Sequence, residues 1–322
     1  MKVLHLVYFD VCILTSVLQH CTQLTSLRLE ECTIDTILWQ IIRRNRNLKE
    51  LHLLDCRGER SMLYGLSMSS CLVGANILKL LLAGSLVHDQ AFVKIPSHTP
   101  NLRALDVSAA QFTNAALVKV SELCRNITHL TIYNHTLDDA TFVKVVTNLT
   151  CIHAITVTHT AITNISLQAL AAAHGRSIVA MELNVGAHLT EQHTSTFLNG
   201  CTALLTLALH YLRPFNMAAM LRGADLTRLT SLNVGTDWDN SVLLAVAERC
   251  PHLQLFGCRF ANQPHTIIPE LRCIALRCTH LRAIYLGFTL SDDRFNVLRT
   301  EDPGLWKIDQ DFPTFAVISM HI

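Results

Sequence analysis

A six-residue frame, L-x-x-L-x-L, recurs along this chain about every twenty-five residues. Apolar residues fill its first, fourth and sixth positions, and the first residue of each copy is the anchor of one unit. Clear copies start at Leu24, Leu48, Leu102, Ile127, Ile152, Ile178, Leu204, Leu229, Leu253 and Leu281, with a weaker copy at Ile77. A fixed period of this length predicts a repeat protein in which each unit packs on its neighbours.

Each unit combines two periodicities. It opens with alternating apolar residues, which is the period of a half-buried strand. It closes with apolar residues at helical spacing, as in Ala116, Leu117, Val120 and Leu123. Short polar residues precede these stretches and are expected to cap the helices: Thr113, Asp138, Thr163, Thr190, Asp239 and Ser291. We therefore predict an α/β horseshoe solenoid, with a parallel sheet on its concave face and helices on its convex face.

The frame extends toward both ends of the chain. Leu4-His5-Leu6 predicts the strand of an earlier unit, and Leu305-x-x-Ile308 predicts a final strand that precedes a short tail. No Gly/Ser tract or charge run divides the sequence. Residues 1–322 are therefore expected to form a single repeat domain of about twelve units plus a terminal strand.

Composition excludes several classes of partner. The net charge is +1, so there is no basic excess to contact phosphates, and nucleic acid and anionic membrane surfaces are disfavoured. Half of the residues are apolar, but they fall at the repeat positions and indicate a core. The longest apolar stretch, residues 3–18, contains His5 and Asp10, which argues against both a spanning helix and a signal peptide.

Cysteines occupy fixed positions in the repeat. Five lie three residues before an anchor, two lie eight residues after one, and one fills the sixth position of the frame: Cys21, Cys124, Cys201, Cys250 and Cys278, then Cys32 and Cys56, then Cys258. We interpret them as small buried apolar residues rather than a disulfide framework, which predicts a cytoplasmic or nuclear protein. Four glycosylation sequons, at Asn126, Asn134, Asn148 and Asn164, favour the alternative of a secreted or cell-surface ligand-binding receptor.

The composite unit reads L-x-x-L-x-L-x-x-C-x-I followed by a helix that ends in C-x-x-L, as in residues 24–34 and in Cys250-Pro-His-Leu253. This pattern resembles the cysteine-containing leucine-rich repeats of F-box/leucine-rich-repeat proteins. The resemblance implies a repeat solenoid that recognises substrates for an SCF-type ubiquitin ligase. The F-box module itself is not visible, because repeat-like sequence begins at Leu4.

No catalytic, cofactor-binding or metal-binding residue is predicted. H-E-x-x-H, C-x-x-C, G-x-S-x-G and Walker sequences are absent, although the chain has 17 histidines. We therefore expect a non-enzymatic scaffold that binds a protein partner on its concave face and needs no cofactor. Outward positions there are charged in the first units and aromatic in the last ones. The candidate protein-binding residues are Arg28, Glu30, His52, Tyr211, Arg259, Phe260, Tyr285 and Phe288.

Overall fold

The computed structural model describes residues 2–9, 18, 20–34, 44–58, 76–84, 92–93, 99–108, 112–134, 136–185, 189–211, 215–237, 240–259, 268–286, 306–309 and 316–320. Its residues form two compact units, Met1–Ala173 and His174–Ile322. The expectation of one domain over the whole chain stays a prediction, and each unit is described by itself.

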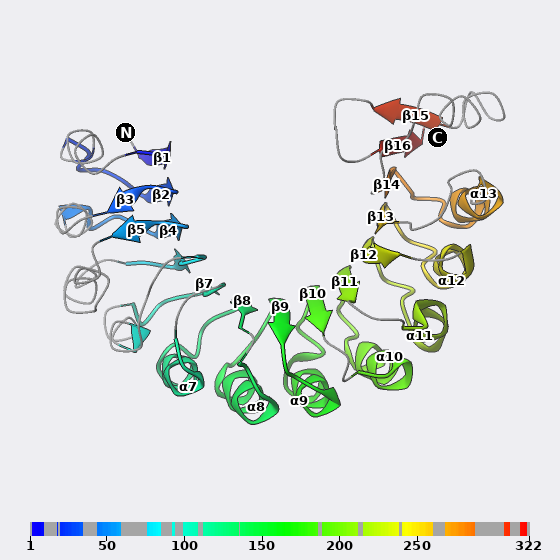
Figure 1. The fold of residues 1–322 in the computed structure, drawn as a ribbon, viewed down its shortest axis with the longest axis horizontal. Helices are drawn as coiled ribbons and strands as arrows, with labels where there is room; N and C mark the ends of the chain where they lie inside the picture. The colour runs from blue at the N-terminus through cyan, green and yellow to red at the C-terminus, as the bar shows by residue number, and fades with distance from the viewer. Residues whose placement is uncertain are drawn as a thin grey trace. The chain divides into compact units, whose positions relative to one another are not determined.

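The first unit is built on a parallel sheet whose strands follow one another in chain order (Figure 1). Its strands are β1 (Val3–Val7), β2 (Ser26–Glu30), β4 (Glu50–Leu54), β6 (Lys79–Leu81), β7 (Ala104–Asp106), β8 (His129–Tyr133) and β9 (Ala154–Thr160). The described helices cover one face of this sheet: α7 (Asn114–Leu123), α8 (Asp139–Asn148) and α9 (Asn164–His174). Two short strands, β3 (Thr33–Ile34) and β5 (Arg57–Gly58), pair in a small separate sheet.

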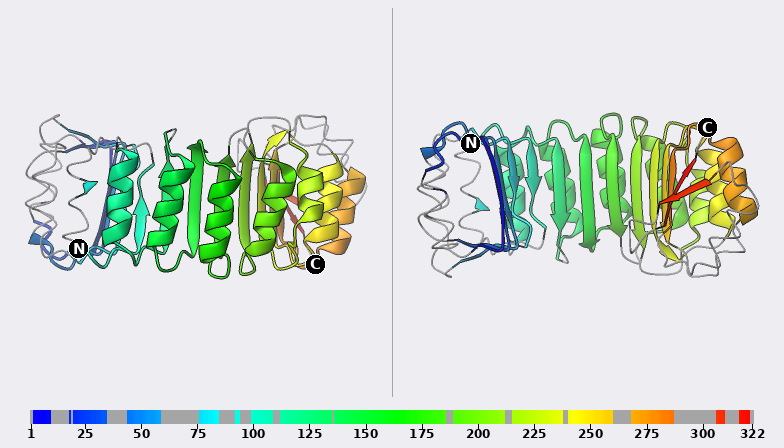
Figure 2. Two further views of the ribbon diagram at one scale, coloured as in Figure 1. Left: turned by 90° about the horizontal axis from the view of Figure 1, so that it is seen from below. Right: turned by 90° about the horizontal axis from the view of Figure 1, so that it is seen from above.

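The second unit repeats this arrangement. Parallel strands lie side by side with the helices in a layer behind them (Figure 2). The strands are β10 (Ala180–Val185), β11 (Thr206–Tyr211), β12 (Ser231–Asp237), β13 (Leu255–Arg259) and β14 (Ala283–Leu286). The helices are α10 (Glu191–Gly200), α11 (Met217–Gly223), α12 (Asn240–Arg249) and α13 (Ile268–Arg277).

The end of the second sheet differs from the sequence expectation. A strand does form near Ile308, as β15 (Trp306–Asp309), but it does not pair with β14. Between them lies β16 (Ala316–Met320), which is antiparallel to both. The segment expected to be a short tail therefore contributes a strand, and the parallel order ends at β14.

The apolar frame forms the core, as predicted. Leu27, Leu51, Leu80 and Leu105 are direct neighbours on successive strands, and each is at most 2% exposed. The anchors are buried as well, and this includes the weaker copy at Ile77. Full burial of one leucine side chain contributes about 1.5–3 kcal/mol, so the same contribution recurs three times in every unit. The polar residues that alternate with the frame consequently lie on the opposite, open face of the sheet.

A residue in the left-handed region turns the chain away from the sheet after β2, β4 and β6, as Tyr8 does after β1 with φ of +61°. Glu31 and Asp55 have φ of +50°, and Gly84 has φ of +67°. Each lies seven residues after its anchor, and its N–H donates at 2.8–2.9 Å to the carbonyl of the residue that directly follows the frame in the next unit. This bond fixes a left-handed conformation that favours glycine, which only one of the three positions carries. No sequence signal predicted it.

The eight cysteines at repeat positions are buried, which confirms their interpretation as core residues. They also connect neighbouring units. The Cys56 thiol donates to the carbonyl of Leu29 on the preceding strand, at 3.5 Å, and Cys278 donates to the carbonyl of Cys250 at 3.2 Å. Asn45 replaces cysteine at one such position, and its Nδ2 donates to the carbonyl of Cys21 at 2.8 Å. The position three residues before the anchor therefore bridges adjacent units, whether it carries cysteine or asparagine.

Four of the six predicted helix caps are confirmed, including Thr163, whose Oγ1 accepts a hydrogen bond from the N–H of Ile165 at 3.2 Å. Thr113, Asp138 and Thr190 each accept a hydrogen bond from the backbone N–H three residues later. Asn216 caps α11 in the same way and was not predicted. Asp239 and Ser291 lie outside the described residues. The helix predicted from Ala116, Leu117, Val120 and Leu123 forms as α7, but Leu123 is 47% exposed and Ser121 is the buried residue of its last turn.

Candidate functional site

The open face of the first sheet carries a group of polar side chains at its β1 end. We call this group the polar patch; it consists of His5, Ser26, Arg28, Glu30, Glu50, His52 and Lys79. Parallel pairing in register places His5, Arg28 and His52 in one row across β1, β2 and β4. A second row runs through Ser26, Glu50 and Lys79 on β2, β4 and β6. The regular strand spacing, about 4.8 Å, brings residues that are about 24 positions apart within contact distance.

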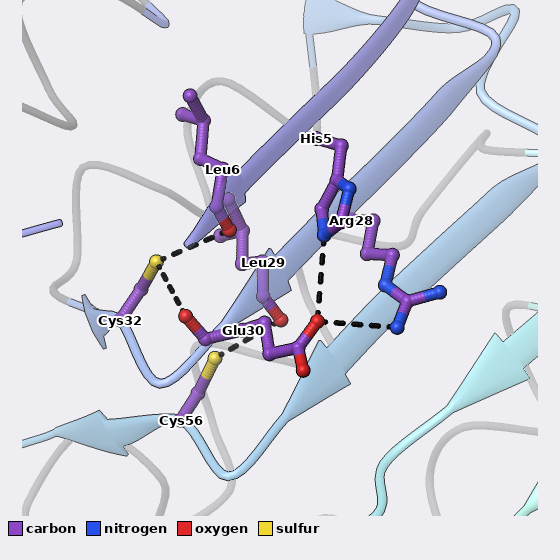
Figure 3. A network of polar contacts seen from close by, with 7 residues as sticks. All are labelled: His5, Leu6, Arg28, Leu29, Glu30, Cys32 and Cys56. Carbon is purple, nitrogen blue, oxygen red and sulfur yellow. Dashed lines mark hydrogen bonds and ion pairs between the residues drawn. The ribbon is translucent and has the colours of Figure 1, made fainter. Parts of the chain in front are cut away.

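Glu30 is the centre of an ion-pair network (Figure 3). Its Oε2 accepts a hydrogen bond from Arg28 Nη2 at 3.1 Å and lies 3.4 Å from His5 Nε2. The hydrogen bond from Arg28 is the main reason why the pKa of Glu30 is lowered, and His5 adds to the effect. Glu30 is therefore held as a carboxylate, and the three side chains are held together by one another on a solvent-accessible surface.

A second polar contact lies on the same face. Ser26 Oγ donates to Glu50 Oε2 at 2.9 Å, between β2 and β4. Toward β7, Asp106 Oδ1 accepts from the backbone N–H and the hydroxyl of Ser108, at 2.9 and 2.6 Å. Most charged groups of this face thus have partners, and the surface presents fixed rather than freely rotating charges.

His52 differs from its neighbours. It lies on the open face but is only 8% exposed. Neither ring nitrogen has a hydrogen-bond partner among the described residues, and the same holds for Arg28 Nε in the adjacent strand. Burial lowers the pKa of His52, and the nearby positive charges of Lys79 and Arg28 lower it further, against the opposing effect of Glu50 and Asp106. The ring is therefore neutral near pH 7, and its polar atoms are covered.

The second unit presents a different open face. His210 Nε2 lies 3.4 Å from Glu182 Oε1, so that an imidazole on β11 reaches a carboxylate on β10. The His210 ring also covers Gly235 on β12, where a Cβ would lie 1.8 Å from His210 Nδ1. Glycine at this position is thus required by a close approach rather than by backbone conformation. Asn233 similarly covers Gly257 on β13, with Oδ1 at 3.0 Å from the position of a Cβ.

Three of the candidate residues at the predicted aromatic end of this face lie on strands of the second unit. Tyr211, Arg259 and Tyr285 lie on β11, β13 and β14, but only their backbones are described. Phe260 and Phe288 lie outside the described residues. The structure therefore describes the side chains of Arg28, Glu30 and His52 from the predicted set, and it brings these three together. His5, Ser26, Glu50 and Lys79 were not among the candidates, although strand register alone could have placed them there.

Other histidines and cysteines do not assemble a metal centre. Within the described part of the chain, no three His, Cys, Asp or Glu side chains are placed to hold a metal ion. His129 and His153 are neighbours, and burial followed by the charge of His153 lowers the pKa of His129. The Cys151 thiol lies 3.6 Å from His153 Nε2. No described helix has the length and apolar character needed to cross a membrane.

A small pocket of about 220 Å³ lies in the second unit, away from the sheet face. It is lined by the end of α10 and by the segments that follow α10 and α11. Its polar groups bond to one another: Asn199 Oδ1 accepts from the N–H of Asp225 at 2.6 Å, and Arg228 Nη1 donates to the carbonyl of Thr202 at 2.7 Å. The pocket is therefore part of the contact between neighbouring repeats.

No protein-family model matches the sequence, and neither does any curated protein. Solved structures do match. Rad7, from a complex of Rad7 and Elc1 in yeast, superposes with a TM-score of 0.62 at 13% identity, over 88% of this chain and 75% of that one. An internalin, InlF from Listeria monocytogenes, has a TM-score of 0.46 at 16% identity, over 81% of this chain and 73% of that one. The fold is that of a leucine-rich-repeat solenoid, a parallel sheet alternating with helices.

Proposed function

We propose that this chain is a non-enzymatic protein-binding scaffold and that the polar patch contributes to the selection of its partner. The observation that carries the proposal is the Arg28–Glu30–His5 network, in which polar side chains from two strands are held in position on an open sheet face (Figure 3). Prearranged charges favour a complementary surface and disfavour others, because unpaired charges are costly to bury. Leucine-rich-repeat solenoids generally use such surfaces to bind proteins.

Exchange of charge at Arg28 tests this proposal. Arg28→Glu places a carboxylate beside Glu30 and should weaken the binding of partners whose acidic groups are attracted by Arg28. The matched control is Lys119→Glu on α7, because Lys119 is also half exposed and also pairs with a glutamate, Glu122 at 2.9 Å. Both variants should keep the circular dichroism of the parent chain. Affinity capture with quantitative mass spectrometry should show at least about a fivefold loss for Arg28→Glu alone. Equal capture by both variants would contradict the proposal.

A more specific proposal follows from the repeat pattern: substrate recognition for an SCF-type ubiquitin ligase, in the cytoplasm or nucleus. It is supported by the buried cysteines at the positions typical of F-box/leucine-rich-repeat proteins. A likeness of fold to Rad7, which was solved in complex with Elc1, is compatible with it. The test is co-purification of cullin-ligase subunits with the tagged chain. Their absence from every preparation that still captures a partner would reject the ligase role and retain the scaffold.

The alternative, a secreted or cell-surface receptor, draws support from one observation: the sequon residue Asn126 is exposed, in the turn after α7. Mass spectrometry of the native protein separates the two candidates. A glycan on Asn126 would favour the receptor. Free thiols and an unmodified Asn126 would favour the intracellular scaffold.

A further inference from the structure

The strands of the first sheet all run in the same direction, so the turns that lead into them lie along one edge of the sheet. The described residues of these turns and of the strand starts carry a group of basic side chains. We call this group the basic rim; it consists of Arg46, Lys49, Lys79, Arg103 and Arg125. Lys79 is half-buried and the other four are exposed. In the described turns and strand starts before β2, β4, β6, β7, β8 and β9, the one carboxylate is that of Glu50.

Backbone hydrogen bonds fix the spacing of the basic rim. Lys49 and Arg103 occupy equivalent positions, one residue after their anchors. The carbonyl of Lys49 accepts from the N–H groups of Leu78 and Lys79, at 2.7 and 3.0 Å. The carbonyl of Arg103 accepts in the same way from the turn before β8, at 2.8 and 3.0 Å. Two strand spacings, about 10 Å, therefore separate Lys49 from Arg103, and Lys79 lies on the strand between them.

The charges of the basic rim are not neutralised within the described part of the first unit. The ion pairs described there lie elsewhere, on the open face of β1 and β2 or on α7. Arg125 Nε donates to the backbone carbonyl of Glu122 at 3.2 Å, which leaves its positive charge uncompensated. Glu50 accepts instead from the hydroxyl of Ser26 on β2, at 2.9 Å. The exposed cations therefore remain available to a second molecule.

Stabilisation of helix ends accounts for only part of the basic rim. Cations stabilise the carboxyl end of a helix, and Arg125 directly follows α7 and its C-cap. Lys49 and Arg103, however, directly precede strands, and Lys79 is the first residue of β6. These three residues belong to the sheet layer, so helix ends do not explain their charge.

The opposite edge of the same sheet carries the opposite charge. At the strand ends and in the turns that follow them, one lysine or arginine is described, Arg57. The acidic residues described there are Glu30, Glu31, Asp55, Asp106, Asp138 and Asp139. The net charge of the chain is only +1, so the basic rim is a local excess of positive charge. A long polyanion would extend from this narrow rim over fixed carboxylates, whereas a short acidic segment would not.

We propose that the basic rim binds a short acidic segment of a partner protein, in which several aspartate or glutamate side chains lie close together. The inference rests on the proposed scaffold function. It adds a second surface to the polar patch, with which the basic rim shares Lys79. Attraction at one edge of the sheet and repulsion at the other would also fix the direction in which the partner lies across the strands.

Fluorescence anisotropy with a labelled oligoglutamate peptide tests the proposal on the purified chain. Lys49→Glu combined with Arg103→Glu should raise the dissociation constant at least about tenfold at low salt, and added salt should weaken binding to the parent chain. The matched control is Lys119→Glu combined with Lys144→Glu, which changes the net charge equally through exposed lysines of α7 and α8. Absence of binding to the parent chain, or an equal loss in both double variants, would overturn the proposal.

Two further measurements separate this inference from its alternatives. Oligothymidylate of the same charge as the peptide should bind more weakly; tighter binding that the rim variant loses would assign the rim to nucleic acid and overturn the proposal. The peptide measurement does not depend on the capture experiment with Arg28→Glu. Loss of capture by Arg28→Glu, together with no peptide binding, would reject the acidic segment and retain the scaffold.

Zero-length cross-linking locates the peptide without any substitution in the chain. A carbodiimide couples lysine amines to carboxylates that contact them. Lys49 and Lys144 are both exposed, so their amines are comparably accessible to the reagent. Peptide mapping should show at least about fivefold more oligoglutamate on Lys49 than on Lys144, because bound carboxylates stay beside the rim. Equal coupling at the two lysines would refute binding at the basic rim.

Discussion

His52 shows how a single residue can depart from the repeat pattern. The sequence places it among outward polar positions, and strand register confirms that it lies on the open face. Its burial could not be predicted, because it depends on the particular side chains that the neighbouring strands place beside the ring rather than on the repeat period. By contrast, the burial of the frame leucines follows from periodicity alone, since each repeats the same environment.

The lowered pKa of His52 predicts a loss of stability in acid. The unfolded chain binds a proton near the ordinary histidine pKa of about 6.5, while the folded chain binds it only at lower pH. His52 should therefore destabilise the folded chain progressively as the pH falls below about 6.5. His52→Leu should make the free energy of unfolding less sensitive to pH between about 7 and 5. It should also remove the unpaired ring nitrogens and raise stability near pH 7 by about 1 kcal/mol.

Urea denaturation at several pH values measures this effect. The matched control is His252→Leu, because His252 is exposed. If both leucine variants keep the pH dependence of the parent chain, the covered ring of His52 is not its origin.

The left-handed positions after the early strands predict opposite effects for two substitutions. Glu31→Gly relieves a side chain held at φ of +50° and should stabilise the chain by up to about 1 kcal/mol. Gly84→Ala should destabilise it by about 1–2 kcal/mol, because the new Cβ meets Asp55 Oδ1 at 1.8 Å and φ is +67°. The melting temperatures of the two variants show directly whether each substitution stabilises or destabilises the chain. An unchanged melting temperature for Gly84→Ala would mean that Asp55 moves aside without cost.

At the scale of the elements, the starts of successive helices are joined by side chains that the sequence did not reveal. Asp139 opens α8, yet it accepts hydrogen bonds from the N–H and hydroxyl of Thr163 and from the hydroxyl of Ser166, at 2.8, 2.6 and 2.5 Å. It therefore caps α9 from the neighbouring repeat. Glu191 in α10 similarly accepts from the N–H of Asn216 at 2.8 Å. Sequence analysis assigned caps within each repeat, because local spacing carries no information on contacts between repeats.

Asp139→Ala should destabilise the first unit by about 2–4 kcal/mol, since it leaves Thr163 and Ser166 without their acceptor. Burial opposes ionisation of this carboxyl, but the hydrogen bonds from Ser166 and Thr163 outweigh it and lower its pKa. Its stabilising effect should therefore be present above pH ~4 and be lost as the pH falls below that value.

Denaturation of Asp139→Ala measures the effect at pH 7 and at pH 3. Glu122→Ala is the control, because the exposed pair of Glu122 with Lys119 contributes about 0.5 kcal/mol or less. Equal effects of the two substitutions would show that the link between α8 and α9 does not stabilise the unit.

At the scale of the whole molecule, repetition makes stability a sum of contacts between neighbours. The repeat period predicted the fold of parallel strands alternating with helices, because every unit has the same pattern of apolar residues. It did not predict the antiparallel β16, since the frame is absent from that segment. It also did not predict which polar side chains pair, because pairing depends on the identity of each neighbour rather than on the period.

Because each unit contacts only its neighbours, a substitution in the core should destabilise mainly the strands beside it. Leu209 on β11 is fully buried, and Leu209→Ala should cost about 2–5 kcal/mol. Hydrogen exchange should then accelerate in β10, β11 and β12, while β2 and β4 in the first unit keep their protection. Loss of protection in β2 to the same extent would show that the two units unfold together.

The bridge formed by Asn45 and the cysteines has a consequence for how such a chain can change its length. At Asn45, Cys124 and Cys278 the side chain donates to the carbonyl of the equivalent position one repeat earlier. The same joint therefore recurs between three different pairs of consecutive units, although their other side chains differ. A whole repeat could be duplicated or deleted in the gene, and the new neighbours would still meet with a donor facing a carbonyl.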